Sequence, residues 1–229
     1  MSDKKLPLAF HLEELRGRLL ICLFTMTILS LISFTIWPKI VSLMWINDIN
    51  MIYISPQEAF LTRIKVSLIC GLLGSIPVIL YEIWKFIRPA LTKRERKLTI
   101  GLGIVSAVLF FAGIYFNVFI VTPIVVRFFL RSSQPTLTPL ISISNYTSFL
   151  INMTLAFALV SQLPLLMVLA AVLGLVNAHI FSKYRKITII GIFFLAAVLT
   201  PPDALSQLAL ALPMWGLYEL GLIVIKIIR

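Results

Sequence analysis

The amino-acid sequence predicts an all-α polytopic membrane protein with six transmembrane helices. Of its 229 residues, 60% are hydrophobic and only 13% are charged, whereas about 25% of the residues in a soluble domain are charged. The mean hydropathy is +1.03. The apolar residues form continuous runs near the ~20 residues needed to cross the hydrocarbon layer. Continuous runs favour helices over the alternating strands of a membrane β-barrel.

Polar links divide the chain into the spans of a single membrane domain that covers residues 1–229. Before the first span, Leu12, Leu15 and Leu19 fall on one helix face. This pattern predicts that residues 1–18 form an amphipathic cytoplasmic segment at the membrane interface. The expected spans are residues 19–37, 66–87, 98–121, 146–176, 187–199 and 204–225.

Proline residues interrupt several of these spans. Pro77, Pro164 and Pro213 lie within spans, whereas Pro123 lies at the end of the third, which we expect to continue as a helix towards Arg131. A proline cannot donate to the carbonyl four residues earlier, and its ring bends a helix. The sequence therefore predicts several kinked helices that form a curved or cupped wall.

The last apolar stretch is too long for one span. Residues 187–225 number 39, and only Asp203 and Glu219 among them are charged. One helix of that length would be ~58 Å long, about twice the hydrocarbon thickness. The prolines of TPPD end the incoming helix, and Asp203 suits the first turn of the next one. We expect a hairpin whose incoming span, with only 13 residues, requires a thinned bilayer or access of water.

The distribution of cations predicts the orientation. The chain has 20 lysines and arginines against nine acidic residues, a net charge of +11. Fifteen of these cations precede the first span, fall in the second and fourth links, or follow the last span. The other five are Lys39, Arg63, Lys65, Arg127 and Arg131. Because cytoplasmic loops are enriched in Lys and Arg, both termini are expected on the cytoplasmic side. Topology then explains the basic charge without a nucleic-acid partner.

The residue patterns predict no cofactor, metal site or catalytic centre. Cys22 and Cys70 lie in apolar runs, as small packing residues do. His11 and His179 lie near the interfaces and cannot supply paired haem ligands within the membrane. No group of His, Cys and acidic residues has metal-ligand spacing, and no nucleophile with a partner base is recognisable. We therefore expect a receptor, channel-like or scaffold protein and not an enzyme.

Acidic residues are scarce on the basic face, which makes their positions informative. Glu13 and Glu14 lie in FHLEELRGRL before the first span, and Glu95 lies in TKRERK. One interpretation is local, with Glu14 paired to Arg18 at i, i+4 and Glu95 balancing its cationic neighbours. The other is a binding site, because two carboxylates can hold planar guanidinium groups by bidentate hydrogen bonds. The residues alone leave both interpretations open.

Polar side chains inside the apolar runs offer a second candidate site. Gln162 lies just before Pro164 and needs a hydrogen-bond partner, which is either another helix or a functional group. A small secondary transporter or ion channel, using Gln162, Gln207 and Glu219 as a polar path, is the alternative function. No internal repeat supports the transporter interpretation.

Two further acids are interpreted as boundary residues. Glu82 lies close in sequence to Lys85 and Arg88, which predicts a salt bridge there. Glu219 is expected to pair with Lys226 or to lie near the cytoplasmic interface.

The chain contains three long motifs, HLEELRGRL at 11–19, FIRPALTKRERK at 86–97 and LTPPDALSQLALALPMWGLYELG at 199–221. Together they resemble the TatC family, the polytopic core of the twin-arginine protein translocase. IPVILYEIWKFI at 76–87 fits the same family. The resemblance covers nearly the whole chain, in order and at the spacing of six spans.

The resemblance implies that the chain recognises signal peptides with a consecutive Arg pair. It would support the export of folded proteins, driven by the proton-motive force, together with TatA-like and TatB-like single-span proteins and with self-association. The implied location is the bacterial inner membrane, or the thylakoid membrane if the chain is plastid-encoded.

The resemblance also implies roles for individual residues. Glu14 and Glu95 match the acids of the family's signal-peptide site, whereas Glu13 takes a position that the family does not require to be acidic. The residues that match the same loop motif and would shape the site are Phe86, Pro89, Leu91 and Arg96.

Three polar residues match positions that the family implies for intramembrane or partner contacts. Gln162 stands where many members carry a glutamate just before a proline, so a charge-based role is in doubt here. Asp203 and Gln207 match the hairpin motif, which implies a polar patch that contacts partner helices. The competing interpretation is helix capping and packing of the hairpin.

Overall fold

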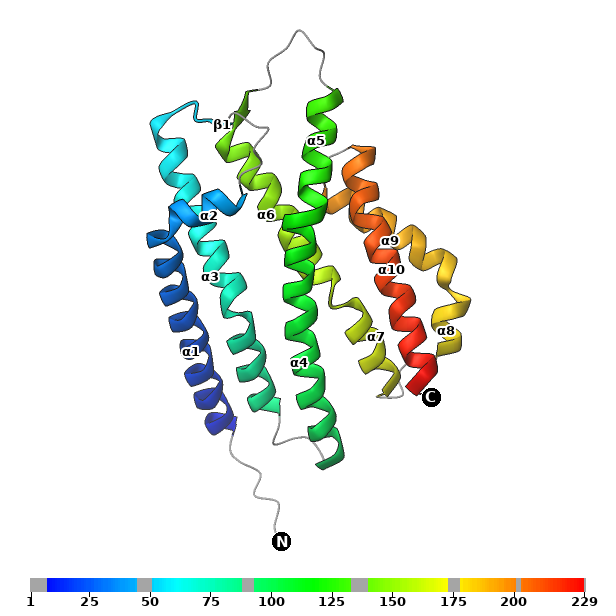
Figure 1. Ribbon diagram of the computed structural model, residues 1–229. Helices are drawn as coiled ribbons and strands as arrows, with labels where there is room; N and C mark the ends of the chain where they lie inside the picture. Colours follow the sequence, from blue (N-terminus) through cyan, green and yellow to red (C-terminus); the bar gives the residue numbers. More distant parts are fainter. Residues whose placement is uncertain are drawn as a thin grey trace. The chain divides into compact units, whose positions relative to one another are not determined.

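The computed structural model is almost entirely helical (Figure 1). It describes residues 8–44, 51–87, 93–132, 140–172, 178–200 and 203–228, and within them it does not describe the side chains of residues 8–12, 87, 93–100, 132, 172, 178 and 228. The chain divides into two compact units. Unit 1 comprises residues 1–45 and 55–107, and unit 2 comprises residues 46–54 and 108–229.

Unit 1 is built on two long helices that pack side by side, α1 (Leu8–Thr35) and α3 (Pro56–Ile87). The short helix α2 (Trp37–Met44) follows α1 after a turn at Ile36, and α4 (Lys93–Phe116) begins in this unit. The first expected span therefore belongs to a continuous helix that starts well before it. Pro38 lies in the first turn of α2, where a proline is tolerated.

Small residues line the contact between α1 and α3. A methyl group added at Gly71 would lie 2.0 Å from Ser30 Oγ and 2.7 Å from the Ser30 backbone nitrogen. The Ser30 hydroxyl itself donates to the carbonyl of Met26 at 2.8 Å. The hydrophobic effect does not drive helices together inside a membrane. Membrane helices therefore often associate where small residues let their backbones approach closely. Further small polar residues buried in unit 1 are Ser33, Thr62, Ser67 and Ser75.

Helix α3 starts at Pro56, ten residues before the expected start at residue 66. The apolar pattern does not report this earlier helix start, because Arg63 and Lys65 interrupt the pattern there. The structure gives Arg63 a specific partner: its Nε and Nη2 donate to the carbonyl of Phe34 at 3.2 and 2.7 Å. Its guanidinium also lies 3.9 Å from the centre of the Phe34 ring. A cation at this position satisfies a carbonyl in the last turn of α1.

Unit 2 contains the helices that follow α4. They are α5 (Thr122–Ser132), α6 (Ile143–Val160), α7 (Leu163–Val172), α8 (Ala178–Lys183), α9 (Arg185–Leu199) and α10 (Ala204–Ile228). Two-residue strands β1 (Met51–Ile52) and β2 (Ile141–Ser142) pair in parallel, with Met51 opposite Ile141. The sequence analysis did not predict these strands.

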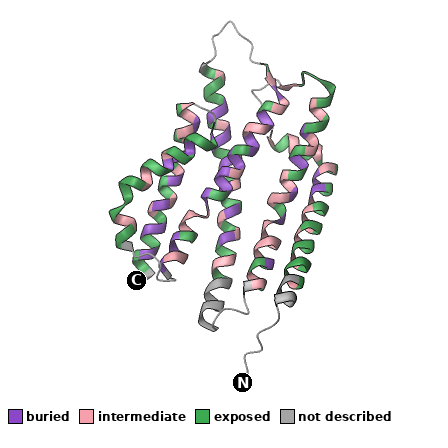
Figure 2. Cartoon of the chain, turned by 180° about the vertical axis from the view of Figure 1, so that it is seen from behind, coloured by how far each residue is buried: buried purple, intermediate pink, exposed green. Residues whose placement is uncertain are grey.

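One face of α10 forms much of the core of unit 2. Leu210, Met214, Tyr218, Leu222 and Ile225 recur at helical spacing, and each is at most 3% exposed. They pack with buried residues of α6, α7 and α9, whereas the opposite face of α10 is exposed (Figure 2). This buried stripe follows from the 3.6-residue period of a helix that faces protein on one side and lipid on the other.

The third expected span continues beyond Pro123, as predicted. Helix α4 passes through a π-helical turn, η2 (Asn117–Val121), directly into α5, which ends at Ser132. Pro123 is the second residue of α5. Asn117 in the π turn is fully buried and donates from Nδ2 to Thr154 Oγ1 of α6 at 2.9 Å.

Five of the described helical stretches are long and apolar enough to cross a membrane. They are Glu13–Thr35, Pro56–Phe86, Gly101–Arg131, Ile143–Ala171 and Ala204–Ile227. They make the chain a multi-pass membrane protein. The remaining expected span, residues 187–199, lies in α9, which has 15 residues. A helix of 15 residues is shorter than the ~20 residues that a full crossing needs.

Candidate functional site

An arginine bridges two carboxylates near the start of α1 and the end of α3. Arg18 Nη2 donates to Glu14 Oε1 on the preceding turn of α1, and Arg18 Nη1 donates to Glu82 Oε2 of α3 at 2.9 Å. The i, i+4 pairing of Glu14 with Arg18 was predicted and is confirmed. The predicted salt bridge of Glu82 is present, but its partner is Arg18, 64 positions earlier, and not Lys85, three positions later; Arg88 lies outside the described residues.

The three side chains differ in exposure. The side chains of Glu82 and Arg18 are 8% and 12% exposed, whereas that of Glu14 is 26% exposed. Glu14 is therefore the member of this group that a ligand reaches first. The group thus brings two carboxylates to one guanidinium. Carboxylates form charge-assisted hydrogen bonds with guanidinium groups, so side chains of this kind can bond an arginine.

Phe86 and the backbones of Glu95 and Arg96 are described and belong to unit 1, like Glu14 and Glu82. Phe86 is half-buried in the last turn of α3. Glu95 lies in the first turn of α4, five residues of link beyond the end of α3, so its backbone is within reach of that end (Figure 1). Its side chain and that of Arg96 lie outside the described residues, as do Pro89 and Leu91. The expected meeting of Glu14 with Glu95 therefore stays a prediction.

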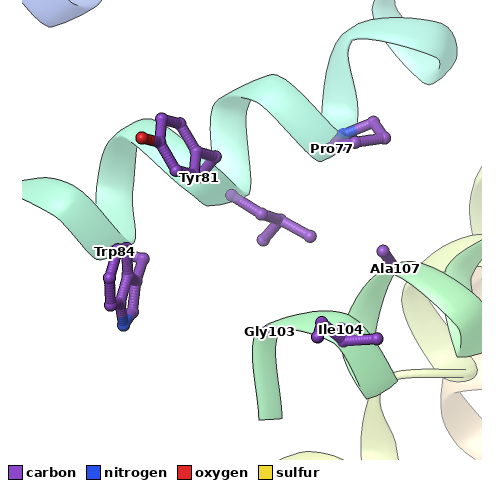
Figure 3. A pocket seen from close by; sticks show the side chains of 7 residues that line it. Pro77, Tyr81, Trp84, Gly103, Ile104 and Ala107 are labelled. Atoms are coloured by element: carbon purple, nitrogen blue, oxygen red, sulfur yellow. The ribbon is translucent and has the colours of Figure 1, made fainter. Parts of the chain in front are cut away.

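An apolar pocket of about 290 Å³ opens beside these residues, between α3 and α4 within unit 1 (Figure 3). Pro77, Tyr81 and Trp84 line it from α3, and Ile104 and Ala107 line it from α4. Gly103 leaves room at its wall, since nothing lies within 4 Å of where its Cβ would be. Tyr81 and Trp84 flank Glu82 in sequence, so the ion group and the pocket share one turn of α3.

The second predicted group, Gln162, Asp203 and Gln207, lies in unit 2. Gln162 follows the end of α6, and its Nε2 lies 3.4 Å from Ser161 Oγ. Asp203 Oδ1 accepts from the backbone nitrogen of Ser206 at 2.7 Å and so caps α10. Gln207 Nε2 donates to the carbonyl of Phe193 at 3.1 Å and ties α10 to α9. Asp203 and Gln207 therefore make the capping and hairpin-packing contacts of the competing interpretation, whereas this hydrogen bond of Gln162 is made with its neighbour in sequence.

Glu219 joins α10 to α9 and does not bond Lys226. Its Oε2 accepts from Arg185 Nη2 at 2.8 Å, and its Oε1 accepts from Trp215 Nε1 at 3.2 Å. Both oxygens of this carboxylate are therefore occupied. The polar path expected of a transporter or channel would need Glu219 to be available, which this pairing disfavours.

The comparison with known proteins settles the family. The family model for Sec-independent protein translocase protein (TatC) matches residues 10–213. This chain belongs to the TatC family. The matched range includes the group around Arg18, the link with Glu95, and the hairpin with Asp203 and Gln207.

Curated TatC proteins match almost the full length of the chain. The Sec-independent protein translocase protein TatC of Carboxydothermus hydrogenoformans is 35% identical to this chain. The match covers 100% of this chain and 96% of the relative's length. The protein of the same name from Escherichia coli K12 is 35% identical over 94% of this chain and 86% of its own. The relatives named here are bacterial. TatC proteins are membrane components of a translocase and not enzymes, so the expectation that the chain is not an enzyme is confirmed.

A solved structure shares the fold as well as the sequence. The crystal structure of the twin-arginine translocase receptor TatC in the detergent DDM superposes with a TM-score of 0.81. It is 31% identical in sequence and covers 94% of this chain and 99% of the TatC chain. The TatC family assigned by resemblance from the three motifs is therefore confirmed.

Proposed function

We propose that this TatC-family chain is the receptor subunit of a twin-arginine translocase. It binds signal peptides that carry two consecutive arginines and supports the export of folded proteins at the expense of the proton-motive force. The observation that carries the proposal is the half-buried carboxylate of Glu14, held at the α1–α3 boundary in a motif of this family. The likeness to a solved twin-arginine receptor supports it.

The proposed site lies at the end of unit 1 where α1 begins, α3 ends and α4 begins. Glu14 and Glu95 hold the two guanidinium groups, because a carboxylate accepts two parallel hydrogen bonds from a guanidinium and an ammonium group cannot form that fork. The residues that shape the site around them are Phe86, Pro89, Leu91 and Arg96. The surrounding cations repel basic peptides that lack a paired arginine motif.

The chain works as one six-span membrane domain with both termini in the cytoplasm of a bacterial cell, in its inner membrane. The excess of cations on the links and termini of one side supports this orientation. Labelling from one side of sealed vesicles tests it: a cysteine placed at exposed Arg16 reacts from the cytoplasmic side, whereas one at exposed Arg131 reacts from the other side. Reversed labelling would refute the orientation.

The partners are TatA-like and TatB-like single-span proteins and further copies of this chain. Gln162, Asp203 and Gln207 offer polar contacts to partner helices. Amide and carboxylate groups hydrogen-bond across helices in a membrane, where unsatisfied polar groups are costly. The cap does not use the full bonding capacity of Asp203: its second oxygen, Oδ2, is buried without a partner among the described residues.

Site-specific photo-crosslinking tests the proposed function. A photoreactive residue at position 14 or 95 should crosslink a labelled peptide that contains Arg-Arg and an apolar segment, and the same peptide with Lys-Lys should crosslink less. A photoreactive residue at position 219, in unit 2, serves as the control. Equal crosslinking of the two peptides, or preferential crosslinking at position 219, would contradict the proposed site.

A further inference from the structure

The hydrogen bonds of Arg18 are divided between two carboxylates. One Nη atom donates to Glu14 and the other donates to Glu82. Arg18 Nε is buried and has no hydrogen-bond partner within the part of the chain that the structure describes. Neither carboxylate therefore receives from Arg18 the pair of parallel hydrogen bonds that makes arginine–carboxylate contacts strong.

The two carboxylates are not equivalent to an approaching ligand. Glu82 lies on α3 with 8% of its side chain exposed, and it stays bonded to Arg18 behind the surface. Glu14 is about three times as exposed, at 26%. An incoming guanidinium reaches Glu14 first and gains a bidentate contact there that Arg18 does not make.

We propose that Glu82 is a positioning residue for the signal-peptide site and that Arg18 is an internal competitor for Glu14. Glu82 retains Arg18 when the peptide arrives, so that Arg18 releases Glu14 to an arginine of the peptide without becoming an unpaired buried charge. An unpaired buried charge is costly, and Glu82 removes that cost. This inference rests on the proposed function and assigns to it two residues outside the expected site.

The arrangement also favours arginine over lysine. An ammonium group makes one contact with Glu14 where a guanidinium makes two, so it gains less in exchange for the hydrogen bond that Arg18 gives up. The preference for an Arg-Arg over a Lys-Lys peptide then arises partly from the competition with Arg18 and not only from the bidentate contact with Glu14. A purely structural Arg18–Glu82 bond between α1 and α3 would have no such effect on peptide preference.

Two variants of the full chain separate these roles. In Glu82→Gln, Arg18 loses its bond to Glu82 and holds Glu14 more firmly, so the affinity for a labelled Arg-Arg peptide should fall about tenfold. Adding Arg18→Gln removes this competitor, so the affinity should return to within about threefold of wild type. The double variant should also show a smaller preference for Arg-Arg over Lys-Lys peptide than wild type does.

The measurement is peptide binding to purified protein in lipid nanodiscs, with a thermal unfolding scan for each variant. Glu219→Gln is the matched control, because it removes another interhelical bond between a glutamate and an arginine, at a similar distance, in unit 2. It should bind the peptide as wild type does. Unchanged binding by Glu82→Gln, or a double variant as weak as the single one, would overturn the inference. If wild type binds no Arg-Arg peptide, the proposed function itself fails.

Discussion

Gly71 of α3 lies so close to Ser30 of α1 that a methyl group at position 71 would lie 2.0 Å from the Ser30 hydroxyl oxygen. The same methyl group would lie 2.8 Å from the carbonyl oxygen of Met26. The contact brings together the two helices that carry Glu14 and Glu82. The spacing of α1 and α3, and with it the geometry of the candidate site, thus depends on a residue without a side chain.

Replacing Gly71 by alanine should push α1 and α3 apart. Overpacking of this kind costs about 1–3 kcal/mol, which thermal unfolding of the purified protein in detergent would detect. Ser30→Ala should rescue the variant only partly, because backbone atoms of Ser30 and Met26 also obstruct the methyl group. Gly74→Ala is the control, since its methyl group meets only the end of the Leu29 side chain at 3.3 Å. Equal effects at positions 71 and 74 would contradict the packing.

Arg63 should stabilise unit 1 through its planar guanidinium group and not through its charge alone. Its two hydrogen bonds to the Phe34 carbonyl and its stacking on the Phe34 ring require a planar guanidinium. Arg63→Met should destabilise the protein by about 1.5–3 kcal/mol, because a charge-assisted hydrogen bond is lost. Arg63→Lys should give a smaller but measurable loss in the same unfolding experiment. A lysine variant as stable as wild type would show that charge alone is sufficient.

The buried contact of Asn117 with Thr154 should couple the π-helical turn to α6. A double-mutant cycle with Asn117→Leu and Thr154→Val measures this coupling in isolation. We expect a favourable coupling of about 0.6–1.7 kcal/mol, the range found for hydrogen bonds between membrane helices. Thr154 keeps its hydrogen bond to the Leu150 carbonyl in the single Asn117 variant. The Thr122 hydroxyl loses Asn117 Oδ1 as its acceptor, but this loss is the same in the single and double variants and cancels in the cycle. Strictly additive effects would exclude the coupling.

Asp203 should stabilise the hairpin as a helix cap. Asp203→Ala removes the oxygen that accepts from the Ser206 nitrogen, and the loss of such a cap costs about 0.5–2 kcal/mol. Asp203→Asn keeps an oxygen acceptor and should unfold at nearly the wild-type temperature. If Asp203→Asn abolishes copurification of a TatB-like protein without loss of stability, the carboxylate serves the partner as well as the helix. An alanine variant as stable as wild type would contradict the capping role.

Local patterns in the sequence predicted much of the fold. The continuation of α4 into α5 past Pro123, the start of α10 after Asp203 and the pairing of Glu14 with Arg18 all depend on residues within a few positions of each other. The early start of α3 was missed because Arg63 finds its partner in α1, 29 residues away. Helix formation there depends on a tertiary contact that hydropathy does not report.

The sequence likewise predicted part of the group around Arg18 and missed the rest. The motifs pointed to Glu14 through resemblance to the TatC family, but they gave no role to Glu82 beyond a bond with nearby cations. Its bond to Arg18 joins residues 64 positions apart, and only the packing of α1 against α3 places them together. The signal in the sequence for a distant partner was the position of Glu82 itself: an acidic residue near the end of an otherwise apolar helix needs a cation to pair with.

Binding of a labelled Arg-Arg signal peptide to the chain in nanodiscs tests the central claim most directly, with Glu14→Gln combined with Glu95→Gln as the variant. Glu13→Gln is the matched control, because Glu13 is an exposed neighbour. The account predicts that the double variant loses at least about tenfold in affinity, while the control binds as wild type does. Equal affinity in all three proteins would contradict it.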